Sequence, residues 1–242
     1  MKNLVALAVL PGLLIMFWVY KKDKIEKEPK GLLFKLFILG AISIIPAVLL
    51  EWGAEWVLES SLTDGMDELL IIALDNFLGV ALMEEFCKYI MLKKGSWKHP
   101  AFDYRFDGIV YSVMVGMGFA VVENIMYVVE NGLSNAIMRA LTSVPGHASF
   151  AICMGVYYGA AKVAESWGDL AQSKKLRKKA LWMPVLMHGF FDFCLSVDSW
   201  VAIVVFFIYI IAVDIVVIKK IKKYSREDTP IYTNYTNDIG AL

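Results

Sequence analysis

The chain has 242 residues, of which 58% are hydrophobic, and its mean hydropathy is +0.58. Soluble domains contain about 45–50% apolar residues, so this composition excludes an ordinary soluble domain and indicates a polytopic membrane protein. The 24 basic and 24 acidic residues balance, which gives no sign of a nucleic-acid-binding surface. We therefore expect a lipid bilayer around the chain and no nucleic-acid partner.

Seven apolar stretches are long enough to cross a bilayer core, which takes about 20 residues of helix. We predict an all-α integral membrane protein with about seven transmembrane helices around a polar intramembrane cavity. The fifth stretch is long enough to be tilted or broken, and Pro145-Gly146 supplies a break. The first lacks a small-residue cleavage site, so we expect a retained helix. The expected spans are 3–20, 31–50, 68–92, 108–130, 134–163, 180–197 and 199–218.

The spans leave no room for a soluble domain between them. We expect one polytopic membrane domain over residues 1–223 and a polar cytoplasmic tail over residues 224–242. The three cysteines all lie within expected spans and show no CxxC spacing, so neither a disulfide framework nor a cysteine zinc site is indicated. They are Cys87, Cys153 and Cys194.

Four basic clusters fix the expected orientation in the membrane. They lie at residues 21–30, 93–99, 174–179 and 219–223. With seven spans all four fall on one side, and the excess of Lys and Arg in cytoplasmic loops makes that side cytoplasmic. The sequence therefore predicts an N-terminus outside and a C-terminus inside.

Ionisable side chains occur within several of these apolar spans, most densely in "ALMEEFCKYIM" at residues 81–91. A central Asp, Lys or Arg costs roughly 2.5–3.5 kcal/mol on insertion scales. Such groups are tolerable only where they face partner helices or a water-filled cavity, and they usually mark functional sites. The set comprises Asp75, Glu84, Glu85, Lys88, Glu123, His147, His188, Asp192 and Asp214.

Two spacings within this set predict specific contacts. Glu84 and Lys88 are four residues apart, which suits a helical ion pair. Glu85 lies about 100° round the helix from Glu84, so the two carboxylates should have different roles. His188 and Asp192 are also four apart, and Asp192 is placed to fix the tautomer of His188.

Two members of this set, and one arginine outside it, are interpreted as structural. Asp75 and Asp214 are expected to serve helix packing, and Arg139 is expected to extend to the outer interface of the membrane. Pairing between helices could in principle explain the whole polar set. Complementary groups on four consecutive spans, however, favour a functional site over helix packing alone.

These groups suffice for peptide hydrolysis without a nucleophilic side chain. A carboxylate can accept a proton from water, imidazoles can donate to the developing oxyanion, and Asn124 can orient a water or the substrate. The same atoms could instead bind zinc, through His147 and His188 with Glu85 or Glu123. Because the first arrangement needs no metal, we expect hydrolysis to survive chelation. GxSG, GxGD and HExxH motifs are absent.

The four polar segments together resemble the PrsW family of intramembrane proteases, which is related to the type II CAAX prenyl endopeptidases. "EEFCK" matches the family's EExxK, and "FAVVEN", with Glu123 and Asn124, matches FxxxEN. "HASF" supplies His147, and "HGFFD" supplies His188 and Asp192. The wider CAAX group has EExxxR and a histidine in the second motif, so the departure favours the PrsW branch.

The resemblance implies a multi-pass protease of a bacterial plasma membrane. It implies cleavage of a membrane-spanning anti-sigma factor as the first step of an envelope-stress response. The site residues it implies are Glu84, Glu85, Lys88, Glu123, Asn124, His147, His188 and Asp192. Within this set we expect Glu85 to be the base and Lys88 to hold Glu84. The alternatives are a non-enzymatic proton or cation carrier and a membrane scaffold.

Overall fold

The computed structural model describes residues 2–58 and 65–231, and these residues are almost entirely helical. The link between the second and third expected spans falls partly at residues 59–64, outside the described residues. The helices are α1 (Lys2–Lys22), α2 (Lys30–Ile42), α3 (Ile44–Leu58), α4 (Glu68–Leu74), the π-helix η2 (Asp75–Ala81), α5 (Leu82–Ser96), α6 (Asp107–Leu141), α7 (Ser143–Ser166), α8 (Leu170–Ser196) and α9 (Trp200–Arg226).

The predicted all-α membrane fold is confirmed. Four segments of the described chain are long and apolar enough to cross a membrane, and one of them comprises both α6 and α7. The helices at the third and sixth expected spans are present but carry more charge. Seven spans therefore stay a prediction. The four segments are Val5–Lys22, Lys30–Leu58, Asp107–Ser166 and Trp200–Arg226.

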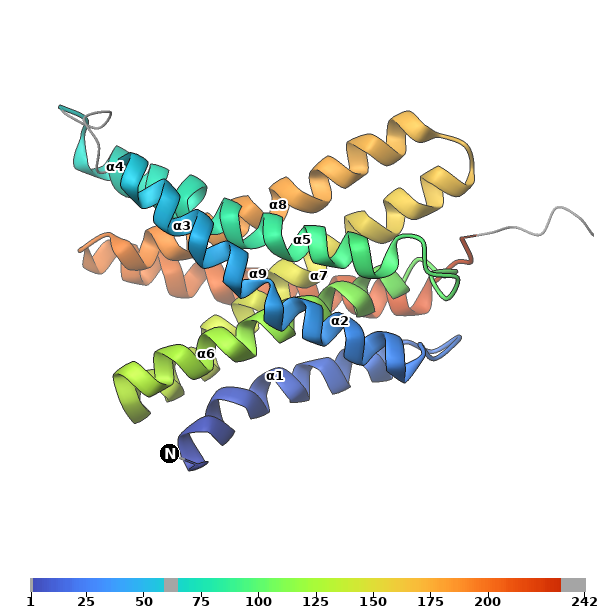
Figure 1. The fold of residues 1–242 in the computed structure, drawn as a ribbon, viewed down its shortest axis with the longest axis horizontal. Helices are drawn as coiled ribbons and strands as arrows, with labels where there is room; N and C mark the ends of the chain where they lie inside the picture. The colour runs from blue at the N-terminus through green and yellow to red at the C-terminus, as the bar shows by residue number, and fades with distance from the viewer. Residues whose placement is uncertain (1, 59–64, 232–242) are drawn as a thin grey trace, which may run out of the picture.

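Helices α6 and α7 form the centre of the bundle, with α1 and α2 against α6 and with α8 against α7 (Figure 1). Glycine allows the close approach of α2 and α6. A Cβ on Gly118 would lie 2.1 Å from the carbonyl oxygen of Phe37, so only a residue without a side chain fits there. Large apolar side chains of α9, including Trp200, Ile208 and Ile211, point outward where lipid would surround them.

All four basic clusters lie at one end of the bundle. The α1–α2, α5–α6 and α7–α8 links gather there with the end of α9, at the right of Figure 1. The turn of α6, the start of α4 and the α8–α9 link lie at the opposite end. The four clusters therefore lie together in the structure, and the predicted orientation requires them to lie on one side of the membrane.

The helix break expected at Pro145-Gly146 occurs earlier in the chain, at Gly132 and Thr142. Gly132 has φ 75° and ψ −159°, so α6 turns back there, and Thr142 (φ −122°, ψ −62°) separates α6 from α7. Pro145 lies in the first turn of α7, where the missing N–H costs no helical hydrogen bond. The fifth expected span, 134–163, is thus two helical segments separated at Thr142, and the chain reverses at Gly132, before that span begins.

The tail also begins differently from the prediction. Helix α9 continues to Arg226, and residues 227–231 pack back on the α5–α6 link. The backbone N–H of Ile231 donates to Asp103 at 2.6 Å, and that of Arg105 donates to Thr229 at 3.0 Å. Ile231 is buried. The part of the predicted polar tail at residues 232–242 lies outside the described residues.

Candidate active site

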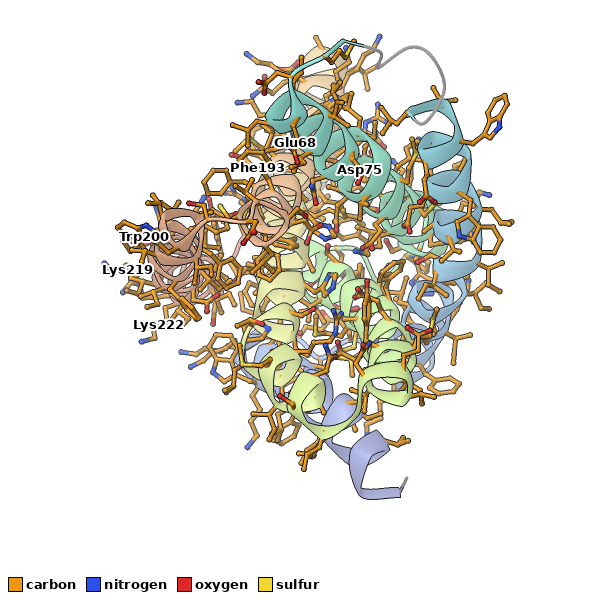
Figure 2. All side chains as sticks on the ribbon, turned by 90° about the vertical axis from the view of Figure 1, so that its left-hand side faces the viewer. Glu68, Asp75, Phe193, Trp200, Lys219 and Lys222 are labelled. Carbon is orange, nitrogen blue, oxygen red and sulfur yellow. The ribbon has the colours of Figure 1, made fainter. Side chains whose placement is uncertain are left out.

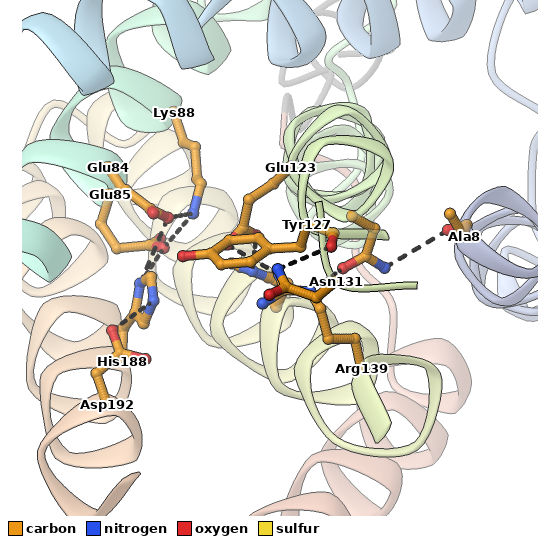
Figure 3. A network of polar contacts seen from close by, with 12 residues as sticks. Ala8, Glu84, Glu85, Lys88, Glu123, Tyr127, Asn131, Arg139, His188 and Asp192 are labelled. Atoms are coloured by element: carbon orange, nitrogen blue, oxygen red, sulfur yellow. Dashed lines mark hydrogen bonds and ion pairs between the residues drawn. The ribbon is translucent and has the colours of Figure 1, made fainter. Parts of the chain in front are cut away.

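The four sequence motifs converge on one cavity of about 700 Å³. Helix α5 supplies Glu84, α6 supplies Glu123, α7 supplies His147, and α8 supplies His188 and Asp192 (Figure 3). Figure 2 views the bundle from the end opposite the basic clusters, with Asp75 of η2 among the helix ends there. The lining also includes Asp75, Asn135, Ser196 and Ile203, which lie near that end of the bundle.

One lysine joins the two adjacent carboxylates of α5. Lys88 Nζ lies 2.8 Å from Glu84 Oε2 and 2.8 Å from Glu85 Oε1. It also lies 4.0 Å from the centre of the Phe119 ring. The predicted Glu84–Lys88 pair is confirmed, whereas the equal contact with Glu85 was not predicted. Spacings of three and four residues place both carboxylates within reach of one ammonium.

The two glutamates nevertheless face different surroundings, as their positions round the helix predict. Glu84 lines the 700 Å³ cavity. Glu85 is 1% exposed, does not line that cavity, and contacts Lys88 and His188. A general base must reach the water that it deprotonates. The geometry therefore favours Glu84 over Glu85 as the carboxylate in contact with the reacting group.

His147 is held by a carboxylate on the neighbouring helix. Its Nε2 lies 2.7 Å from Glu123 Oε2, a contact that fixes the ring orientation. Its Nδ1 is buried and has no hydrogen-bond partner among the described residues. If Nε2 carries the proton and donates to Glu123, then Nδ1 presents a free lone pair.

His188 lies between three carboxylates. Its Nε2 is 3.1 Å from Asp192 Oδ2, as the spacing predicted, and its Nδ1 is 3.1 Å from Glu85 Oε1 and 3.8 Å from Glu84 Oε2. The rings of His147 and His188 have centroids 5.3 Å apart. Asp192 and Glu123 thus each orient one histidine beside Glu84.

The prediction that Arg139 extends to the outer interface is wrong. The chain reverses at Gly132, so Arg139 returns to α6 and lies 2.9 Å from Glu123 Oε1. Its Nε donates to Asn124 Oδ1 at 2.8 Å. The predicted water-orienting residue Asn124 does not line the cavity, and its contact with Arg139 favours a positioning role.

The sequence reasoning missed Glu51 of α3. Glu51 lines the same cavity as Glu84, and its Oε1 is buried without a hydrogen-bond partner among the described residues. The signal was present, because Glu51 interrupts the apolar run "VLLEWG", but the second expected span ends at residue 50. Asp75 lines the cavity as well. Asp214 accepts from Ser149 at 2.9 Å and lies outside the cavity lining, as a structural role requires.

The model of the PrsW family of intramembrane metalloproteases matches residues 28–218. The chain belongs to the PrsW family. It is 34% identical to a protein named Protease PrsW from Geobacillus kaustophilus, over 83% of each chain. It is 32% identical to the Protease PrsW of Clostridioides difficile, over 95% of this chain and 94% of that one.

A third relative, the Protease PrsW of Bacillus subtilis, is 32% identical over 82% of this chain and 85% of its own length. No solved structure matches the chain. Membership of the PrsW family makes this protein an intramembrane protease and a multi-pass membrane protein. The alternatives of a carrier and a scaffold are thereby set aside.

The matched family is described as one of metalloproteases, and the residues that line the cavity could bind a metal ion. One atom from each of Glu84, His147 and His188 lies within 4.8 Å of the others. The unpartnered His147 Nδ1 is the lone pair that a metal requires, and Glu123 behind the ring matches the carboxylate–histidine support of zinc sites. His188 Nε2 lies 3.1 Å from Asp192 Oδ2, and Nδ1 could ligate in exchange for its hydrogen bond with Glu85. The expected zinc set shared these histidines but named Glu85 or Glu123 in place of Glu84.

Proposed function

We propose that this PrsW-family protease hydrolyses a membrane-spanning anti-sigma factor in the 700 Å³ cavity. The observation that carries the proposal is the convergence of Glu84, Glu123, His147 and His188 from four helices on that cavity. The site opens among helix ends opposite the basic clusters, which supports cleavage near the outer face of a bacterial plasma membrane. The anti-sigma substrate rests on the family resemblance of the motifs.

We propose that Glu84, His147 and His188 hold a zinc ion. When bound, zinc acts as a Lewis acid and lowers the pKa of a coordinated water toward 7. Glu123 and Asp192 keep the histidines in their ligating orientation. Lys88 offsets the charge of two buried carboxylates, and Glu85 positions Lys88 and His188. The expectation of hydrolysis without metal, drawn from the sequence, is replaced here because His147 Nδ1 lacks a protein partner.

To accept a proton from water, a carboxylate in the cavity must not already be held in an ion pair. Glu123 contacts His147 and Arg139, and Glu84 contacts Lys88, whereas Glu51 Oε1 is unpartnered in the described structure. The water oxygen bonds to the scissile carbonyl carbon while its proton passes to Glu51. Glu51 then returns that proton to the amide nitrogen as the C–N bond breaks.

Purified protein in liposomes with a tagged single-span anti-sigma peptide tests this function. We expect two fragments whose masses place the cut within the span or at its outer edge. Cleavage should stop on thorough chelation and return with stoichiometric zinc. Cleavage that persists after verified removal of metal would contradict the zinc assignment, and the absence of cleavage of any single-span peptide would contradict the function.

A further inference from the structure

A second group of acids lies at the basic end of the bundle, away from the protease cavity. Asp23 and Glu28 belong to the α1–α2 link, and Asp107 is the first residue of α6. One carboxylate oxygen from each lies within 4.8 Å of the others. The three side chains are 2%, 3% and 2% exposed, so water does not screen their mutual repulsion.

No salt bridge of the described residues reaches these three acids, although Lys27 acts on Asp23 electrostatically from farther away. Among the described residues, no Lys or Arg nitrogen lies within 4.0 Å of the Asp23, Glu28 or Asp107 carboxylates. The nearby Lys27 donates instead to the backbone carbonyls of Asp23 and Tyr20. A buried charge is ordinarily paired or coordinates a metal, so this arrangement calls for a counter-ion.

One carboxylate oxygen of the cluster has no hydrogen-bond partner among the described residues. This observation supports a bound ion and does not depend on how close the three acids lie. Asp23 Oδ2 is buried and has no hydrogen-bond partner in the described structure. Asp107 Oδ2 accepts from the backbone N–H groups of Asp103 and Tyr104 at 3.1 Å and 2.7 Å, and the Asp107 carboxyl is also hydrogen-bonded to Glu28. Glu28 is hydrogen-bonded to the Tyr111 hydroxyl. Hydrogen bonds therefore hold Glu28 and Asp107 in place, and Asp23 Oδ2 is available to a ligand.

We propose that Asp23, Glu28 and Asp107 bind a divalent cation of the Mg²⁺ or Ca²⁺ class. The donors are all oxygens, which suit hard cations, whereas the catalytic cavity offers imidazoles that suit zinc. Burial raises the pKa of Asp23 to about 6, that of Glu28 to about 7 and that of Asp107 to about 10, which reflects the cost of their charges without an ion. Residues 24–27 of the link are exposed and offer an entry path.

A bound cation would tie three parts of the chain together. It would connect the α1–α2 link to the start of α6. Asp228 also acts electrostatically on Asp23 and accepts from the Phe106 N–H at 2.9 Å, so the segment after α9 adjoins the same cluster. The site would therefore stabilise the basic end of the bundle and takes no part in the proposed hydrolysis.

Thermal unfolding of the purified full chain, after treatment with chelator, tests the site. Addition of MgCl2 or CaCl2 should raise the Tm by several degrees in a saturable way, because the ion binds the folded state. KCl at matched ionic strength should not. Asp23→Asn should lose the shift, whereas Glu26→Gln, an exposed acid of the same link, should keep it. An equal shift in Asp23→Asn and wild type would contradict the proposal.

Direct binding of Mn²⁺ separates this site from the catalytic one. In the Glu84→Gln background, electron paramagnetic resonance should count about one tightly bound Mn²⁺ per chain. Adding Asp23→Asn or Glu28→Gln should weaken that binding by at least about tenfold, because ligand charge sets the affinity for hard cations. Binding that is absent from Glu84→Gln, or unchanged by both further substitutions, would overturn the assignment.

Discussion

At the scale of single residues, two side chains that look equivalent in the sequence can differ in whether they reach the cavity. Glu84 and Glu85 are neighbours, share Lys88 and are both almost fully buried, yet only Glu84 lines the cavity. The 100° step between successive helical residues accounts for the difference. Chemistry at this site thus depends on which side of α5 a carboxylate occupies.

Glu51 should be essential for turnover but not for folding. We expect Glu51→Gln to reduce cleavage by about 10²–10⁴-fold, the usual contribution of general acid–base catalysis, because the amide cannot accept a proton. Glu55→Gln, one turn further along α3 and exposed, should cleave like wild type. Equal rates for both variants, measured per folded protein, would remove Glu51 from the mechanism.

Lys88 should matter first for stability. Lys88→Met leaves Glu84 and Glu85 buried without their shared cation, and breaking a buried ion pair in this way costs about 3–5 kcal/mol. We expect a markedly lower Tm in detergent, whereas Lys222→Met, on the exposed end of α9, should unfold at the wild-type temperature. A wild-type Tm for Lys88→Met would show that the lysine does not neutralise the pair.

At the scale of secondary-structure elements, the turn in α6 brings a distant arginine to the site. Gly132 has φ 75° and ψ −159°, a region open essentially to glycine, and the reversed segment carries Arg139 to Glu123. The hydrophobic pattern continues on both sides of the turn, so periodicity could not reveal it. The π-helical segment η2, directly before α5, likewise has no signature in the apolar pattern.

Gly132→Ala should therefore destabilise the protein by about 1–3 kcal/mol through backbone strain alone. A Cβ at Gly132 would meet no atom within 4 Å, so steric overlap is not the cause. Gly53→Ala is the matched control, because Gly53 is helical in α3 and its added Cβ also meets nothing. We expect a lower Tm and slower cleavage for Gly132→Ala only. Similar Tm values for the two variants would contradict a strained turn.

At the scale of the whole molecule, composition and charge predicted the helical membrane fold, and the motifs predicted which spans carry the candidate site residues. The ion pair of Lys88 with Glu84 and the approach of Asp192 to His188 followed from four-residue spacing. Contacts between distant segments did not follow, because no local rule relates Glu123 to His147 or returns Arg139 to Asn124. Glu51 was missed because its span was assumed to end one residue earlier.

The predicted orientation can be tested at two exposed positions. We expect a membrane-impermeant thiol reagent, added to intact cells, to label Met66→Cys and to miss Gln172→Cys. Both side chains are exposed. The native cysteines Cys87, Cys153 and Cys194 are buried and serve as the unlabelled background. Labelling of Gln172→Cys alone would invert the topology.

The central claim is that peptide hydrolysis takes place where Glu84, His147 and His188 meet. Cleavage of a single-span substrate per folded protein, compared between Glu84→Gln and Asp214→Asn, tests it most directly. Both substitutions convert a carboxylate within the helical bundle to its amide, but Asp214 is bound to Ser149 outside the cavity lining. We expect a loss of at least about 10²-fold for Glu84→Gln, because a bound metal supplies several kcal/mol of transition-state stabilisation, and near wild-type cleavage for Asp214→Asn. Wild-type cleavage by correctly folded Glu84→Gln would contradict it.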